Sequence, residues 1–181
     1  MKTKTTFFQR DDIGWNPLSV YCSPSTGDFL VGMHWPENDR GKVNRLNFSG
    51  QHIQIILENK TCSFPHYITE NKNGDVVVSA YYKHYVEVAE NGGKYRYSFR
   101  PSKFKLGTSY LIPKGICTDP LLNIMVCGDN NVLATDKDGQ FLTYLLNRKH
   151  TAQCLNNDDN CHLLWVGKWM MTNYLYLSTV T

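Results

Sequence analysis

Hydrophobic and polar residues alternate along residues 65–99 in four short runs separated by turn residues. The runs 66–70, 75–80, 85–89 and 94–99 carry β-branched and aromatic residues at alternate positions, which is typical of half-buried strands. The connections contain Asn-Gly and Gly-Gly pairs, which favour tight hairpin turns because these residues accept positive φ angles. The pattern therefore predicts a four-stranded antiparallel meander.

The same pattern occurs before and after this segment with a period of 48 residues. Pro17, Pro65 and Pro113 mark the period. A unit of this length with four strands is typical of a β-propeller blade, and such a sheet buries both faces only when neighbouring units stack on it. The sequence predicts an all-β fold, a partial or small β-propeller with about four four-stranded antiparallel sheets in a single domain, residues 1–181. The predicted units cover residues 16–57, 64–99, 112–146 and 152–180.

The period also assigns a place to the N-terminal residues. Residues 3–9 alternate in polarity and lie where the fourth strand of a preceding unit is expected, whereas the last unit has three strands. One hypothesis is that residues 3–9 pair with residues 173–180, which would complete the last sheet and remove an exposed edge. The alternative is that the chain is a fragment of a longer propeller. Unpaired edge strands in an open arrangement also predict self-association.

Composition describes a globular protein. Of the 181 residues, 41% are apolar, 13% aromatic and 19% charged, which excludes a disordered tail and a coiled coil. The apolar runs are far shorter than the roughly 20 residues of a membrane span, and the first twelve residues have no apolar signal core. We therefore expect no membrane association and a cytoplasmic location.

The six cysteines predict no metal site. Without a secretory signal, reduced thiols in the core are the favoured interpretation. The sequence has no Cys-x-x-Cys pair, and the nearest cluster, Cys154, Cys161 and His162, lacks zinc-ligand spacing. We expect no metal and no other cofactor.

The units resemble NHL repeats. The resemblance is carried by the Gly27-Asp28 and Gly74-Asp75 turns, by residues 113–116 and by residues 138–141, and it extends over about residues 5–180. It is strongest to the propeller at the C-terminus of tripartite-motif proteins, especially their expanded molluscan relatives. Such proteins carry a RING finger, a B-box and a coiled coil ahead of a six-bladed propeller, and their ligase chemistry resides in the RING. The resemblance implies a truncated recognition module without the RING enzyme, acting in a ubiquitin-ligase context.

Candidate binding residues gather on one predicted face. Strands within a blade alternate in direction, so the loops between second and third strands share a face with the links between units. Residues 94–105 on and beside this face contain five basic residues, four aromatic residues and no acid. The candidate partner-binding residues are Trp35, Tyr81, Tyr82, Lys83, His84, Arg100, Lys103, Phe104, Lys105 and Trp169.

Three interpretations of these residues remain open. They suit a protein interface, because Tyr, Trp and Arg are favoured anchors there. They equally suit single-stranded RNA, with cations on phosphates and rings stacked on bases. They also suit plain packing, since alternation in residues 94–99 describes a half-buried outer strand, and the two tryptophans could pack against neighbouring blades. The net charge of +3 does not decide among them.

Catalysis is the disfavoured function class. Lactonase-type propellers hold a metal with carboxylates on their inner strands, but the equivalent positions here are Cys22, Glu70 and Thr118, which cannot form a metal cage alone. No serine elbow, phosphate loop or His-Glu-x-x-His motif occurs. The sequence predicts a non-enzymatic recognition module that binds a protein partner, with RNA binding or a degenerate fragment without independent function as alternatives.

Overall fold

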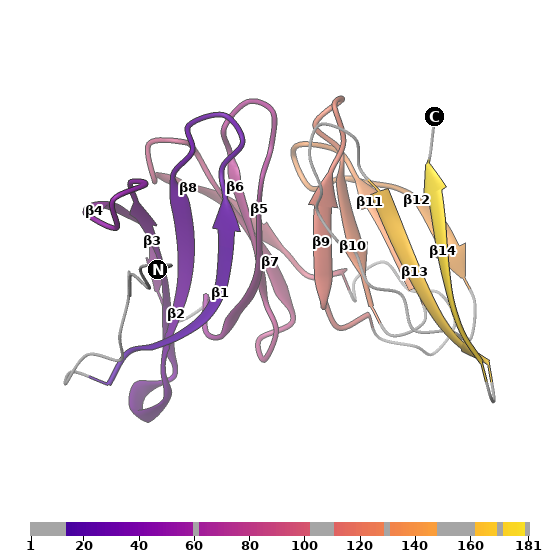
Figure 1. Cartoon of the computed structure of the whole chain (residues 1–181), viewed down its shortest axis with the longest axis horizontal. Coiled ribbons are helices and arrows are strands. Elements are labelled where there is room, and N and C mark those ends of the chain that lie inside the picture. Colours follow the sequence, from indigo (N-terminus) through magenta and orange to yellow (C-terminus); the bar gives the residue numbers. More distant parts are fainter. Residues whose placement is uncertain are drawn as a thin grey trace, which may run out of the picture.

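The computed structural model describes residues 14–59, 62–101, 111–128, 131–147, 162–169 and 172–179, the last two ranges by their backbone. The strands of these residues form three four-stranded antiparallel sheets and one two-stranded sheet (Figure 1). The all-β, propeller-like prediction is confirmed. The first sheet contains β1 (Asn16–Cys22), β2 (Phe29–Trp35), β3 (Arg40–Leu46) and β4 (His52–Asn59). The second contains β5 (Pro65–Glu70), β6 (Val76–Ala80), β7 (Tyr85–Ala89) and β8 (Tyr95–Phe99).

The third and fourth sheets follow the same order along the chain. The third contains β9 (Gly115–Thr118), β10 (Ile124–Cys127), β11 (Asn131–Thr135) and β12 (Phe141–Asn147), and the fourth pairs β13 (His162–Trp169) with β14 (Thr172–Thr179). β4 and β12 extend to Asn59 and Asn147, beyond the predicted unit ends at residues 57 and 146. The proposed strand of residues 3–9 and the first strand of the last unit lie outside the described residues.

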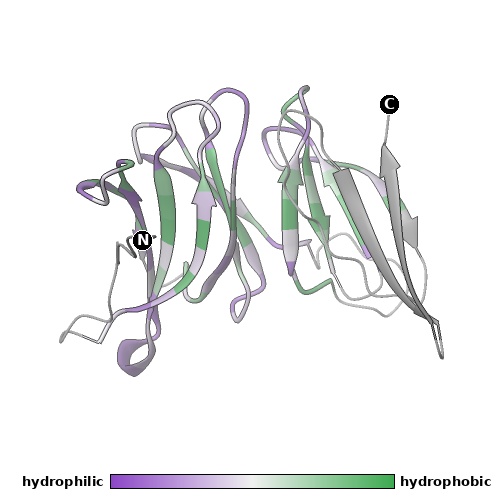
Figure 2. Cartoon of the chain, viewed as in Figure 1, coloured by the Kyte–Doolittle hydropathy of each residue, from purple (hydrophilic) through white to green (hydrophobic). Residues whose placement is uncertain are grey.

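Successive sheets stack face to face because both faces of each central strand are apolar. In β6, Val76 and Val78 join a core cluster with Leu30 and Val43 of the first sheet. The intervening Val77 points the other way and joins a cluster with the third sheet. Hydrophobic residues accordingly lie within the strands, while the connections at both ends are more hydrophilic (Figure 2).

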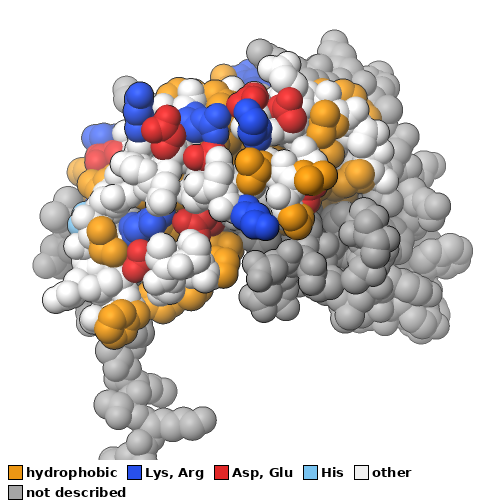
Figure 3. All heavy atoms as spheres, turned by 90° about the horizontal axis from the view of Figure 1, so that it is seen from above, with side chains coloured by type: hydrophobic (Ala, Val, Ile, Leu, Met, Phe, Trp, Pro, Cys, Tyr) orange, Lys and Arg blue, Asp and Glu red, His pale blue; other side chains and the backbone are white. Residues whose placement is uncertain are grey.

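The connections form two opposite faces. The hairpin face carries the turns between first and second strands and between third and fourth strands. The linker face carries the β2–β3 and β6–β7 connections and the links between sheets. Basic and acidic side chains lie side by side on the hairpin face (Figure 3). There Arg96 of β8 contacts Asp75 and lies 3.2 Å from Asp138 of the third sheet. Arg96 therefore joins two sheets through ion pairs.

The β2–β3 connection is short. The two strands stay paired up to Trp35 and Arg40, so only residues 36–39 join them, including the 3-10 turn Pro36–Asn38. The alternation predicted for residues 94–99 is broken in β8, since a register shift opposite Val88 and Ala89 skips Arg96. As a result Tyr97 packs beside the core with Phe99, while Tyr95 is exposed.

The cysteines differ from a uniformly reduced set. Cys22, Cys62 and Cys117 are not disulfide-bonded, and Cys62 and Cys117 are buried. Burial raises the pKa of the Cys62 thiol well above its usual value, with the negative charge of Glu87 acting in the same direction, so this thiol stays protonated. Cys127 takes part in a disulfide bond, which corrects the expectation of a free thiol at that position.

Candidate recognition site on the linker face

An aromatic cluster occupies the linker face where the first and second sheets meet. Phe64, in the link between the sheets, lies at its centre. Its ring is 4.4 Å from that of Tyr82, 5.1 Å from that of His34 and 5.8 Å from that of His66, measured between centroids. The ring of Tyr81 lies 5.6 Å from both His66 and Tyr82. Residues from β2, the intersheet link and the β6–β7 turn thus share one surface.

Backbone contacts fix the position of this cluster. The Tyr81 amide donates to the carbonyl of Phe64 at 3.3 Å, and the His84 amide donates to the carbonyl of Tyr81 at 3.2 Å. Gly41 allows the closest approach, because a Cβ at that position would lie 1.8 Å from the carbonyl oxygen of Cys62. The β3 strand therefore runs directly against the intersheet link, and only glycine fits there.

Left-handed backbone concentrates at the same place. Asp39, Phe64 and His84 have φ angles of 51°, 59° and 57°. A left-handed conformation costs a non-glycine residue about 1–2 kcal/mol, and such residues often cluster at binding sites, where surrounding contacts hold them. Three of the four positive-φ residues other than glycine in the described part of the chain lie in this site.

A small ionic network adjoins the rings. Nζ of Lys83 lies 2.5 Å from Oδ2 of Asp39, and the Ser63 hydroxyl donates to Oδ1 of the same carboxylate. The hydrogen bonds from Lys83 and Ser63 lower the pKa of Asp39, so the carboxylate is ionised at neutral pH. The charge of Lys83 is therefore neutralised locally rather than left free for an anionic ligand.

The two histidines of the cluster are neutral at pH 7. Burial lowers the pKa of His34, and the nearby Asp39 carboxylate, 4.0 Å from Nε2, opposes this only in part. Burial also lowers the pKa of His66, and the positive charge of Lys114 adds to the effect. The Nδ1 atom of His66 is buried without a hydrogen-bond partner in the structure. Both rings thus act as aromatic packing surfaces.

The structure brings together four of the candidate residues predicted from the sequence. Tyr81, Tyr82, Lys83 and His84 form one connection, with Tyr81 half-buried and the other three exposed. Arg100 lies next to this connection, since its guanidinium carbon is 4.4 Å from the ring centroid of Tyr85, the first residue of β7.

The other candidates do not join the cluster. Trp35 packs against Trp15 at 5.6 Å between centroids, on the side of the first sheet that faces away from the second. Trp169 ends β13 in the last sheet, at the far end of the molecule (Figure 1). Lys103, Phe104 and Lys105 lie outside the described residues.

Sequence reasoning missed the residues that the first sheet and the intersheet link contribute, namely His34, Asp39, Ser63, Phe64 and His66. A partial signal existed in Phe64, which immediately precedes the periodic Pro65 and therefore belongs to the link on this face. Asp39 had a weaker signal, since aspartate tolerates left-handed backbone at the end of a turn.

At the inner-strand positions that correspond to the metal sites of lactonase-type propellers, the side chains make structural contacts instead. Cys22, Glu70 and Thr118 are in register, each ending the first strand of its sheet. The Glu70 carboxylate accepts hydrogen bonds from Ser23 and from Arg45, the latter at 3.3 Å, and Thr118 donates to the Glu70 carbonyl at 3.2 Å. Among the described residues no three His, Cys, Asp or Glu side chains are grouped to hold a metal ion.

Comparison with solved structures defines the class as β-propeller. Virginiamycin B lyase from Staphylococcus aureus, solved as a catalytically inactive variant with quinupristin, matches 84% of this chain and 50% of its own, at 16% identity and a TM-score of 0.61. Regucalcin from Agrobacterium tumefaciens, described as a calcium-binding protein, matches 88% of this chain and 56% of its own, at 13% identity and a TM-score of 0.57. A protein of unknown function from Bacteroides caccae matches 87% and 58%, at 13% identity and a TM-score of 0.57.

At these identities the similarity establishes the fold alone. The chain spans about half the length of the solved structures that it matches. No family model and no curated protein matches the sequence. No helix in the described ranges has the length and apolar character needed to cross a membrane.

Proposed function

We propose that this chain is a non-catalytic recognition module that binds a protein partner through the aromatic cluster on the linker face. The cluster offers Tyr81, Tyr82 and Phe64, together with Arg100, as contact residues. Aromatic residues and arginine are enriched at the energetic centres of protein interfaces, because they bury large areas at low entropic cost. Tyr82, with 59% of its surface exposed, is the side chain most available to a partner.

The Lys83–Asp39 ion pair is the observation that favours a protein over RNA. RNA affinity depends on cations that are free to neutralise phosphates. Here Lys83 is already paired with Asp39 at 2.5 Å, Arg100 lies over the Tyr85 ring, and Arg96 is paired with two carboxylates on the opposite face. Mixed charge around exposed aromatic rings is the usual composition of a protein interface rim.

The resemblance to the propellers of tripartite-motif proteins supports a more specific role. We infer that the partner is a substrate of a ubiquitin ligase and that this chain supplies its recognition. This inference rests on the repeat motifs of the sequence.

The test compares capture by the intact chain and by three variants. Tyr82→Ala and Lys83→Glu alter the exposed part of the site, and Leu121→Ala alters an exposed apolar residue in the β9–β10 turn of the third sheet. Proteins recovered by proximity labelling with the wild-type chain and with Leu121→Ala, but lost with both site variants, would support the proposal. Loss of the same proteins from Leu121→Ala, or their retention by the site variants, would contradict it.

A uridine homopolymer tests the RNA alternative directly. Under the proposal, the chain binds it only weakly and Tyr82→Ala has little effect. Tight binding that falls steeply with added salt and is abolished by Lys83→Glu would replace protein recognition with RNA recognition.

A further inference from the structure

The first sheet has a face that corresponds, position for position, to faces covered by a preceding sheet elsewhere in the molecule. In the second sheet, Ile68 is paired with Val78, and both are buried against the first sheet. In the third sheet, Ile116 is paired with Val126, and both are buried against the second. The register-equivalent pair in the first sheet is Val20 and Val31.

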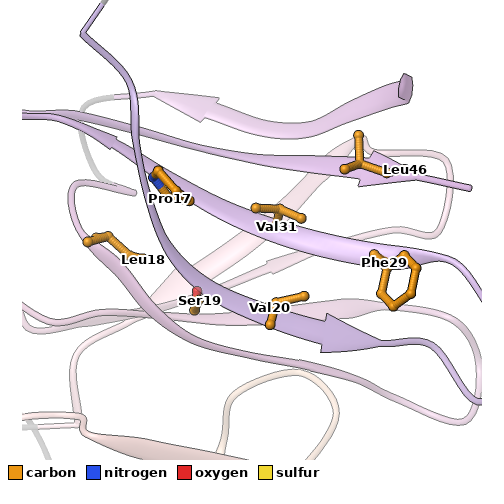
Figure 4. A pocket seen from close by; sticks show the side chains of 7 residues that line it. All are labelled: Pro17, Leu18, Ser19, Val20, Phe29, Val31 and Leu46. Atoms are coloured by element: carbon orange, nitrogen blue, oxygen red, sulfur yellow. The ribbon is translucent and has the colours of Figure 1, made fainter. Parts of the chain in front are cut away.

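The equivalence extends along the sheet. Phe29 and Leu46 of the first sheet are paired as Val76 and Ala89 are in the second. We name Val20, Phe29, Val31 and Leu46 the open face. Figure 4 shows their side chains on one side of β1, β2 and β3, around a hollow of about 450 Å³ that is also lined by Pro17, Leu18 and Ser19. No sheet in the described ranges covers it.

Exposure along the open face is concentrated at Val20. Val20 is 69% exposed, whereas its counterparts Ile68 and Ile116 are 7% and 2% exposed, and Val31 and Leu46 of the open face are buried. At the linker-face end Trp15 and Trp35 cover part of the same sheet, together with Lys42, whose Nζ lies 4.0 Å from the Trp15 ring centroid. Leaving the branched Val20 side chain exposed forfeits the stabilisation that stacking gives its counterparts in the other sheets.

We propose that the open face is the docking surface for the last sheet of a second copy of this chain, so that two copies close one ring. Two observations favour this occupant. The face has the sequence pattern and register of a surface that accepts a preceding propeller sheet. The chain also covers 50–58% of the complete propellers that it matches, so two copies supply about the length of one ring. A two-fold axis through the ring makes the two contacts equivalent and leaves no open face.

The mass of the chain in solution tests this arrangement. Light scattering coupled to size exclusion is expected to give twice the chain's 20.8 kDa at micromolar concentration. Val20→Glu introduces a charge that the exposed position tolerates in the single chain but that the interface would bury. Burial of an unpaired charge is costly, so this variant should raise the dissociation constant by roughly 100-fold or more and elute as a monomer. Its circular dichroism should remain that of the wild type.

The matched control is Leu121→Glu, which places the same charge on a residue that is 79% exposed and outside the open face. It should remain dimeric. A monomeric wild-type chain, including one whose own N-terminal residues cover the face, would overturn the proposal. The proposal would also be overturned if the Val20→Glu variant remained dimeric, if the control lost its dimer to the same extent, or if the wild-type chain formed open-ended polymers.

Small-angle scattering separates a ring from two first sheets stacked face to face. A compact particle of about 360 residues has a radius of gyration of about 21 Å. A value near this is expected for the closed ring. A clearly larger radius, from an elongated dimer that is still abolished by Val20→Glu, would show a face-to-face dimer and overturn the ring.

Discussion

Nζ of Lys83 in the β6–β7 turn lies 2.5 Å from Oδ2 of Asp39 at the end of the β2–β3 turn. This contact joins the connections of two successive sheets across 44 positions of sequence. It also holds the left-handed turn residue Asp39 beside Ser63 and Phe64, so one ion pair and one hydrogen bond organise the edge of the aromatic cluster.

The first prediction concerns this ion pair. Lys83→Met and Asp39→Asn should each lower the free energy of unfolding at pH 7 by less than about 1 kcal/mol, because both groups are partly exposed. Because folding lowers the pKa of Asp39, the stabilisation is present above the unfolded-state value of 3.8 and is lost as the pH falls through the lower folded value. Urea denaturation of both single variants and the double variant at pH 7 and pH 3 measures the coupling. A coupling that persists undiminished at pH 3 would contradict this assignment.

A second prediction contrasts two arginines of β3. Arg45 is buried and pairs with the buried Glu70 at 3.3 Å, while Arg40 pairs with Glu58 at 2.8 Å near the surface. Arg45→Met should destabilise the fold by about 3–5 kcal/mol, because it leaves a buried carboxylate without its cation. Arg40→Met should cost less than about 1 kcal/mol. Chemical denaturation monitored by tryptophan fluorescence compares the two, and equal effects would contradict the assigned burial.

The third prediction tests the close approach of Gly41 to the intersheet link. Gly41→Ala should destabilise the fold by about 2 kcal/mol or more, since the added Cβ meets the Cys62 carbonyl and either backbone must shift. Gly92→Ala is the control, because nothing lies within 4 Å of a Cβ there. The melting temperatures of the two variants report the difference. A neutral Gly41→Ala would show that the link is not packed against β3.

The fourth prediction concerns acid sensitivity. Burial lowers the folded pKa of His34 and His66, so the unfolded chain binds more protons than the folded chain below about the unfolded-state value of 6.5. Stability should therefore fall as the pH is lowered from 7.5 through this value. His66→Phe removes one titrating ring, keeps an aromatic surface and should flatten the profile between pH 7 and pH 5. An unchanged slope in this variant would mean that His66 does not contribute.

The candidate site was predictable only in part. Local alternation and the turn residues placed Tyr81 to His84 in one connection and assigned that connection to a face, because strand direction fixes where each loop emerges. The partners of these residues come from positions 34, 39 and 63–66, and no local pattern links them. Which side chains meet depends on how one sheet rotates against the next, and that rotation is a property of the packed core.

The sequence alone determined the strands of the three four-stranded sheets and their order along the chain. A two-residue alternation, glycine-containing turns and a 48-residue period act locally and repeat, so each unit specifies its own sheet. Tertiary structure decided the rest. Only stacking of the sheets gathered Phe64, Tyr82 and Asp39 into one surface, paired Arg96 with carboxylates from two sheets, and left Val20 exposed where Ile68 and Ile116 are buried. These contacts arise between units, because each sheet buries its faces only against its neighbours.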